Sequence, residues 1–239
     1  MEEIYFLVIV IAIYSIVQSI FGVGLLLLGT PTLLIFEYSF SETLWLLLPC
    51  SLTISVIQVI IGYRFIEAKK RAIYLIIPTL ILGLAIVVTY SSDINITRLA
   101  GIFLLIIGFI KLSPKIYQLL ASRVKKNIRS FYLIIGLVHG VSNMGGGPLS
   151  IVMSSIYTKK EIIRANVAYI YLILVSFQLL ILSIINFSSF RSEVFWLTPI
   201  SFLSYIFTSK FISSKVNDRR YVFILNLMVI TYGILAIIK

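Results

Sequence analysis

Eight apolar segments, separated by short polar connections, account for most of the 239-residue chain. Long apolar runs predict membrane-spanning helices, because about 20 such residues cross a bilayer. The composition points the same way, since 60% hydrophobic and 12% charged residues lie outside the usual range of soluble domains. We therefore predict an all-α polytopic membrane protein. The segments cover residues 4–36, 44–62, 72–90, 99–110, 131–157, 165–186, 194–209 and 221–238.

Two of these segments, 4–36 and 131–157, are the longest, and each is interrupted by glycine. The second contains the run 136–148, which holds five glycines, a proline, an asparagine, a serine and the only histidine, His139. Glycine and proline disfavour a continuous helix. A broken helix at membrane depth is tolerated only inside protein or beside a water-filled cavity. The break therefore predicts a binding site.

The basic residues indicate how often the two interrupted segments cross the membrane. The connections 63–71, 111–130, 158–164 and 210–220 hold 17 of the 20 lysines and arginines. All four connections lie on one side if each interrupted segment enters the membrane and returns as a hairpin, and the positive-inside rule favours that arrangement. We predict cytoplasmic basic loops, both termini outside, and six full spans besides the hairpins. The same placement accounts for the net charge of +11 without nucleic-acid binding.

This topology divides the chain into two inverted repeats, each a glycine-broken helical hairpin plus three transmembrane helices. An odd number of single spans in each half turns the second half over relative to the first. An offset of about 121 residues places Gln18 over His139, and Gln58 falls near Gln178 at an offset of 120. The predicted units are residues 1–113 for the first repeat, 114–130 for a cytoplasmic amphipathic linker helix and 131–239 for the second repeat.

The second break carries residues suited to an oxyanion. A helix that begins at Pro148 would present N–H groups between Gly145 and Leu149 and the positive end of its dipole. Glycine would let an anion approach the backbone, and two side chains would add donors. The alternative is that the glycines only allow the hairpin arms to pack closely. The residues of this candidate site are Ser142, Asn143, Gly145, Gly146 and Gly147.

Other polar residues lie in the same apolar segments. His139 would either bind the anion or carry a proton with it, or else pack as a neutral, hydrogen-bonded side chain. Five further side chains would face a central cavity or join helices by hydrogen bonds. These are Gln18, Thr30, Thr32, Gln58 and Gln178.

The sequence offers little for catalysis or for a cofactor. None of the nine carboxylates lies inside a predicted span, so a carboxylate proton relay is not expected. The single cysteine, Cys50, excludes an internal disulfide and a multi-cysteine metal site. An enzyme using His139 as a base would need a nucleophile, a carboxylate partner or a metal-ligand cluster. We predict no catalytic residue, metal or cofactor, and keep a non-transporting membrane subunit as a further alternative.

Two glycine-rich runs and the halved layout carry a resemblance to a known family. One is Gly-x-x-His-Gly-x-x-x-x-Gly-Gly-Gly-Pro at 136–148, and the other contains Gly22, Gly24 and Pro31. With these runs the chain resembles the TauE/SafE family of sulfite and organosulfur exporters. It departs from the family where Leu25 and Leu26 follow Gly24, because a glycine triplet is usual there.

The resemblance implies a transporter of small sulfur-containing oxyanions, such as sulfite or organosulfonates. Alternating access would expose an anion bound at the glycine-rich hairpin tips. A membrane potential that is negative inside drives a free anion outward by about 2.3 kcal/mol per charge per 100 mV, so export needs no coupling ion. The expected partners are the anion and the lipid bilayer, with a homodimer left open. The motif positions are Gly22, Gly24, Pro31, Gly136, Gly140, Gly145, Gly146 and Gly147.

Overall fold

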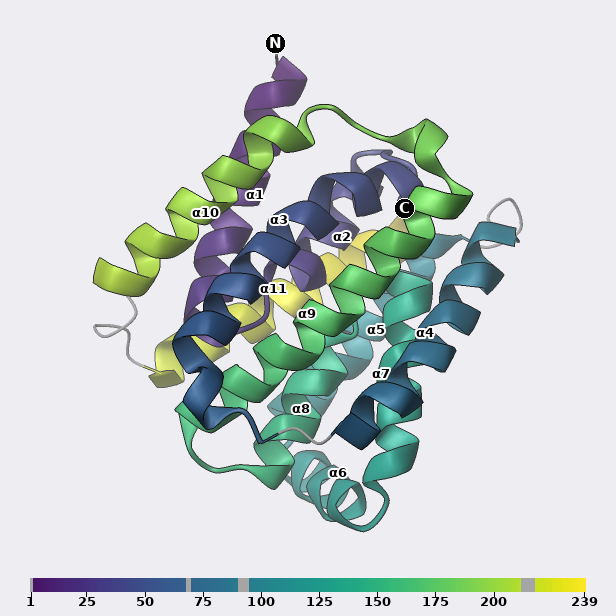
Figure 1. Cartoon of the computed structure of the whole chain (residues 1–239). Helices are drawn as coiled ribbons and strands as arrows, with labels where there is room; N and C mark the ends of the chain where they lie inside the picture. Colours follow the sequence, from purple (N-terminus) through teal and green to yellow (C-terminus); the bar gives the residue numbers. More distant parts are fainter. Residues whose placement is uncertain (1, 68–69, 90–94, 212–217) are drawn as a thin grey trace.

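The fold is built entirely from helices in the part of the chain that the computed structural model describes, residues 2–67, 70–89, 95–211 and 218–239 (Figure 1). This confirms the predicted all-α class. The helices are α1 (Glu2–Phe21), α2 (Leu25–Ile35), α3 (Phe40–Gly62), α4 (Lys70–Thr89), α5 (Ile96–Leu112), α6 (Pro114–Lys126), α7 (Ile128–Ser142), α8 (Gly146–Ile156), α9 (Lys160–Ile185), α10 (Val194–Phe211) and α11 (Asp218–Ile238). Single 3-10 turns follow α3 (Tyr63–Phe65) and α9 (Phe187–Ser189).

Fewer helices meet the length and composition of a full span than the six predicted besides the hairpins. Within the described residues three do so, at Glu2–Ile20, Phe40–Phe65 and Lys160–Ile185. A fourth is reached if α5 and α6, which meet at a 100° bend, are counted as one. The first of the three is α1, an arm of the predicted hairpin, so this arm is longer than a short re-entrant arm requires. At 1.5 Å per residue its 20 residues extend for about 30 Å.

Each interrupted segment nevertheless turns back to the end where it began. The Tyr38 hydroxyl, just after α2, donates to Glu3 at the start of α1 over 3.1 Å. In the second segment, Tyr117 of α6 and Ser154 near the end of α8 share a 2.8 Å hydrogen bond, and α6 directly precedes α7. Figure 1 shows α6 across one end of the bundle and the N-terminus at the opposite end, so the two hairpins open towards opposite ends.

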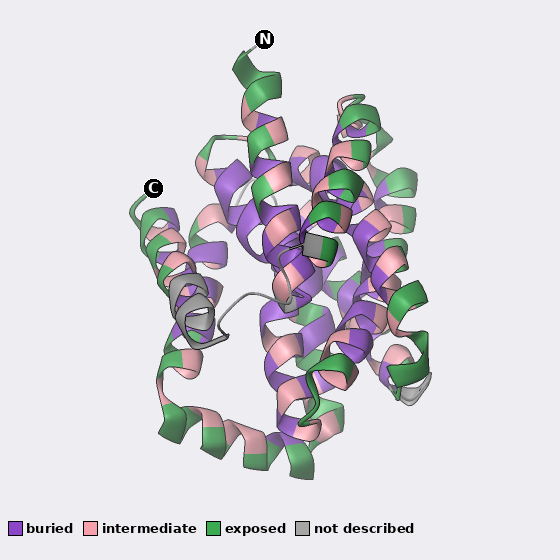
Figure 2. Cartoon of the chain, turned by 90° about the vertical axis from the view of Figure 1, so that its left-hand side faces the viewer, coloured by how far each residue is buried: buried purple, intermediate pink, exposed green. Residues whose placement is uncertain are grey.

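The predicted linker helix is shorter than residues 114–130. It ends at Lys126, because Asn127 leaves the helical backbone and α7 starts at Ile128. Ser113 caps it and Pro114 occupies its first turn, where a missing N–H costs nothing. Its residues are mostly exposed or half-buried, and the helix lies across the lower end of the molecule in Figure 2.

The helices pack in pairs drawn from the two halves of the chain. α1 packs along α10, α4 along α7, α3 along α9 and α5 along α11. The inward faces are buried, whereas the outward faces carry exposed leucine, isoleucine and aromatic side chains (Figure 2). Such an apolar outer surface suits contact with lipid.

Glycine brings α4 and α7 into backbone contact. A Cβ added at Gly136 would stand 2.3 Å from the carbonyl oxygen of Ile76, and one at Gly140 would stand 2.3 Å from that of Leu80. Helices approach this closely where small residues line the interface. At these two motif positions, close packing therefore accounts for the glycine.

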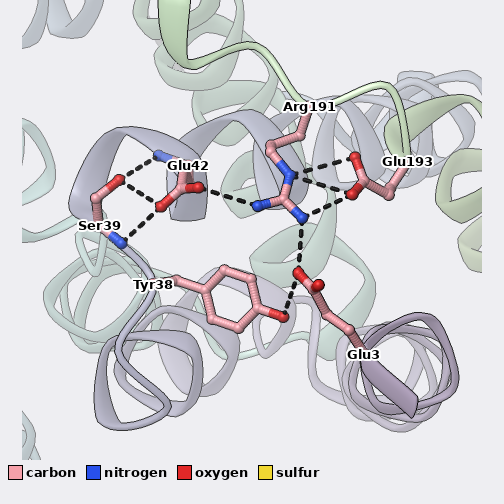
Figure 3. Close-up of polar contacts among 6 residues, drawn as sticks. All are labelled: Glu3, Tyr38, Ser39, Glu42, Arg191 and Glu193. Atoms are coloured by element: carbon pink, nitrogen blue, oxygen red, sulfur yellow. Dashed lines mark hydrogen bonds and ion pairs between the residues drawn. The ribbon is translucent and has the colours of Figure 1, made fainter. Parts of the chain in front are cut away.

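Arg191 joins three separate segments at the end that holds the N-terminus (Figure 3). Its guanidinium lies 2.7 Å from Glu3, 3.0 Å from Glu42 and 2.6 Å from Glu193. Hydrogen bonds from Arg191 lower the pKa of Glu193 below its ordinary value of 4.5. Burial, then the hydrogen bond to Glu3, raises the pKa of Tyr38 to about 12.

We expect Arg191→Gln to destabilise the protein near neutral pH by about 1–2 kcal/mol, since charged hydrogen bonds are lost but solvent screens them. Glu193 has a lowered pKa when folded, so its contribution is present above pH 4.5 and is lost as the pH falls below it. The difference from wild type should therefore shrink towards about pH 3. Thermal unfolding in detergent at both pH values measures it. The exposed Arg98→Gln should stay within about 0.5 kcal/mol of wild type, and an equal shift in both variants would contradict the prediction.

Candidate functional site

The two helix breaks share one backbone geometry at positions 121 residues apart. Gly22 after α1 has φ 78° and Asn143 after α7 has φ 60°, both in the left-handed region. The Gly22 N–H donates to Gln18 O at 2.8 Å, and the Asn143 N–H donates to His139 O at 2.7 Å. A left-handed residue after the last helical turn is a common way to end a helix. The helices that follow, α2 and α8, both have 11 residues.

A side chain satisfies a backbone donor at each break in the same way. Gln18 Oε1 accepts from the Leu25 N–H at 3.2 Å. His139 Nδ1 accepts from the Gly145 N–H at 3.3 Å. The first N–H groups of a helix have no partner within it, so both side chains stabilise the start of the second arm. Because Nδ1 is an acceptor, this arrangement uses the neutral imidazole with its proton on Nε2.

The second arm starts earlier than predicted. α8 begins at Gly146 with Gly145 as its cap, so Pro148 is its third residue rather than its first. Proline is tolerated there because N–H groups in the first turn have no helical partner.

Several N–H groups predicted to bind an anion at α8 have protein partners in this structure. Gly145 donates to His139, Gly147 donates to Met144 O at 3.2 Å, and Leu149 donates to Gly145 O at 3.0 Å. The Tyr171 hydroxyl lies against Gly146, close to its N–H but without a hydrogen bond of normal geometry. An anion would reach these donors only if the tip rearranged.

The glycine triplet is also tightly packed. An added Cβ would stand 2.6 Å from His139 Cβ at Gly145, 2.1 Å from the Tyr171 oxygen at Gly146, and 2.3 Å from Ile107 Cδ1 at Gly147. Real Cβ atoms essentially never come so close to a neighbour. In this arrangement Gly145 and Gly146 leave no room for a side chain, whereas at Gly147 the flexible end of Ile107 would have to move.

The two hairpins meet through a buried hydrogen bond. Asn143 Nδ2 at the second break donates to Thr30 Oγ1 on α2 at 3.0 Å. Two other predicted site residues make bonds elsewhere. Ser142 donates to Val138 O at 2.7 Å, and Thr32 donates to Leu28 O at 2.7 Å and shares a hydrogen bond with Tyr14.

The remaining predicted residues form two groups. At the first break, Gln58 Nε2 donates to the carbonyl of Gln18 at 3.4 Å. A Cβ at Gly24 would stand 2.8 Å from the Gln18 nitrogen, so that glycine lies within the same group. At the second break, the ring centroids of His139 and Tyr171 are 5.7 Å apart, and Gln178 lies towards the His139 ring.

Buried polar atoms without a hydrogen-bond partner gather around these groups. Buried polar groups in proteins are nearly always bonded, so each exception needs an explanation. Such atoms are expected where a polar ligand or water binds. Within the described part of the chain, those at the breaks are Gln18 Nε2, Gln58 Oε1, His139 Nε2, Asn143 Oδ1, the Tyr171 hydroxyl and both amide atoms of Gln178, while others, such as the hydroxyls of Ser15, Thr43, Ser51 and Ser55, lie along α1 and α3.

Sequence reasoning missed the polar face of α9. Arg164, Tyr171 and Gln178 recur every seven residues, which places them along one side of a helix. Arg164 was assigned only to a basic loop, although the structure has it inside α9 and beside Gly22. The heptad spacing of a cation, a tyrosine and an amide could have revealed this face.

The comparisons with known proteins give one family. The model of the family described as "Sulfite exporter TauE/SafE" matches residues 6–236, nearly the whole chain. No curated protein and no solved structure matches the chain significantly.

Proposed function

Since the chain belongs to the sulfite exporter TauE/SafE family, whose members are membrane transporters and not enzymes, we propose that it exports small sulfur oxyanions such as sulfite or organosulfonates. The protein is a multi-pass membrane protein with an anionic substrate.

The observation that carries this proposal is the gathering of unpartnered buried polar atoms at the two breaks. An anion that leaves water needs replacement donors, because an unpaired buried charge is costly. Gln18 Nε2 has no hydrogen-bond partner among the described residues, and Gln178 and His139 Nε2–H lie near each other without a hydrogen bond of normal geometry, so all three can donate to a ligand. The backbone at both breaks projects few side chains into this region because it consists largely of glycine, which has no side chain. These glycines are Gly22 and Gly24 at the first break and the triplet at the second.

Alternating access would explain why the second tip is packed. The donors of Gly145, Gly147 and Leu149 have protein partners in this arrangement, and Asn143 is bonded to Thr30. We infer that the anion gains these donors, and the side chains of Ser142 and Asn143, in a second arrangement of the tips. Two conformations of this kind are the general basis of transport between repeats.

Inverted repeats are supported by how the helices pair. Suppose that α1 to α5 of the first half are equivalent, in order, to α7 to α11 of the second half. Exchanging the halves then turns the α1–α10 contact into the α7–α4 contact, which is also present. The α3–α9 and α5–α11 contacts each join a helix to its own equivalent. A two-fold axis between the halves produces this pattern. The equal geometry of the two breaks supports the same relation.

The proposed orientation has the termini outside and the basic loops in the cytoplasm. Lys239 forms a 3.1 Å ion pair with Glu37 just after α2, and Glu3 bonds Tyr38 in the same connection. Both ends of the chain thus lie beside the α2–α3 connection, whereas basic α6 lies at the opposite end (Figure 1). A membrane potential that is negative inside drives a free anion outward in either orientation of the protein.

We expect the purified protein to move radiolabelled sulfite and methanesulfonate across proteoliposomes when a voltage is imposed. Flux should reverse with the sign of the voltage, because the anion moves without a coupling ion. Empty liposomes are the control, and folded protein is verified by size-exclusion chromatography. Voltage-independent flux would refute uncoupled export, and the absence of flux for both anions would refute the proposed substrates.

A further inference from the structure

A full positive charge lies beside the first break. Arg164 Nη2 donates to the backbone carbonyl of Ser19 in the last turns of α1. Its side chain also passes Gly22, with Cγ 3.6 Å from the place where a Cβ would stand. A guanidinium has five N–H donors. Among the described residues, that of Arg164 forms a hydrogen bond to Ser19 alone. Its remaining N–H donors make no hydrogen bond to a residue that the structure describes.

Neutral polar groups surround the same point. Gln18 is fully buried, and its Nε2 has no partner among the described residues. Its Oε1 is held by the Leu25 N–H, so its amide stays at the break. Tyr205 of α10 is 3% exposed, and its hydroxyl lies beside Gln58 and within reach of the Arg164 charge.

We propose that Arg164, Gln18 and Tyr205 bind the oxyanion head group at the first break, with Gln58 as a positioning residue. This inference rests on the proposed function and names the first hairpin, not the glycine triplet, as the place where the charge of the anion is met. A guanidinium binds two oxygens of one oxyanion through parallel N–H bonds, which a halide cannot match. The ligand class is therefore a sulfite or sulfonate group that presents two oxygens on one edge.

The site would also couple binding to movement. Arg164 belongs to α9 in the second half of the chain, whereas Ser19, Gln18 and Gly22 belong to the first. An anion bound between them joins the two halves. Moving one half against the other separates its ligands and releases it.

A purely structural role for Arg164 makes a different prediction. A cation at the end of α1 is stabilising because of the helix dipole, and lysine would serve as well as arginine. Two-oxygen binding requires the planar guanidinium. Arg164→Lys therefore separates a binding role from a capping role.

The test is the KM for labelled sulfite in proteoliposomes of the full-length chain. Loss of a charged hydrogen-bond donor should raise KM at least about tenfold in Arg164→Lys and more in Arg164→Gln. Gln58→Glu, which keeps the shape of the side chain, should also lose uptake because its carboxylate would pair with Arg164. It provides a second test if Arg164→Gln fails to fold. Lys159→Gln, which removes an exposed charge at the start of the same helix, should stay within about twofold of wild type.

Folded Arg164→Lys and Gln58→Glu proteins with the wild-type KM would overturn the inference while leaving the proposed function intact. Wild-type liposomes that take up no more anion than empty ones would instead overturn the proposed function itself. A preference of wild type for sulfite over iodide by about ten- to hundred-fold, reduced in Arg164→Lys, is the expected signature of the two-oxygen contact.

Discussion

Gly146→Ala should abolish most sulfite flux and destabilise the protein, because its methyl group would stand 2.1 Å from the Tyr171 oxygen. The two neighbouring ring atoms lie at 2.7 and 2.8 Å, so the ring cannot escape by a small rotation. Overpacking of this kind costs about 1–3 kcal/mol. Chemical unfolding in detergent measures the stability, and proteoliposome flux measures the function. Gly62→Ala is the matched control, since its nearest contact is the Ala165 methyl at 3.1 Å.

A second substitution separates packing from binding at this glycine. Tyr171→Leu removes the end of the ring, so the pair Gly146→Ala with Tyr171→Leu should recover stability relative to the sum of the single changes. We expect flux to stay low in the pair, because the added methyl still stands where an anion would approach the α8 backbone. Full recovery of flux together with stability would mean that Gly146 serves packing alone.

His139→Gln should keep the protein folded and transporting, whereas His139→Leu should not. The first break uses Gln18 to accept the Leu25 N–H, and a glutamine at the second break can accept the Gly145 N–H in the same way. Leucine leaves that buried N–H unsatisfied, which costs about 1–3 kcal/mol, and flux should fall with the loss of the tip geometry.

The same pair of variants tests proton transfer by His139. Glutamine does not titrate, so a transporter that moves a proton through this histidine would lose flux or change its pH profile in His139→Gln. We expect flux between pH 6 and 8 to follow the wild-type profile, because the histidine acts here as a hydrogen-bond acceptor. A lost or shifted profile in a stable His139→Gln protein would establish a proton-carrying role instead.

Local composition alone was enough to predict the helical class and the position of both breaks. The breaks fall at Gly22–Gly24 and Asn143–Gly145, inside the two segments singled out by their glycines. These features are local, because glycine and proline limit helix formation wherever they occur. The offset of 121 residues likewise matched Gln18 with His139, and each accepts a backbone N–H near the start of the second arm, Gln18 from Leu25 and His139 from Gly145, one position apart in that alignment.

Helix ends and lengths were less well predicted. Apolar runs indicate what is buried in lipid but not where the helical backbone stops, so α8 starts two residues before Pro148 and the linker helix ends at Lys126. The length of α1 also exceeds that of its predicted short arm, because lipid-facing and protein-facing helices are equally apolar in sequence.

Only the tertiary structure decided which groups surround each break. Arg164 reaches Ser19 across 145 positions of sequence, and Tyr171 fills the space beside Gly146, because α9 packs along α3 and against α8. The N–H groups of Gly145 and Leu149, by contrast, find their acceptors within the second hairpin, in His139 and Gly145. Sequence determined where the helices had to break, since that depends on the residues at the break. Packing of distant helices determined which charges and donors meet there, since no local rule fixes how those helices approach.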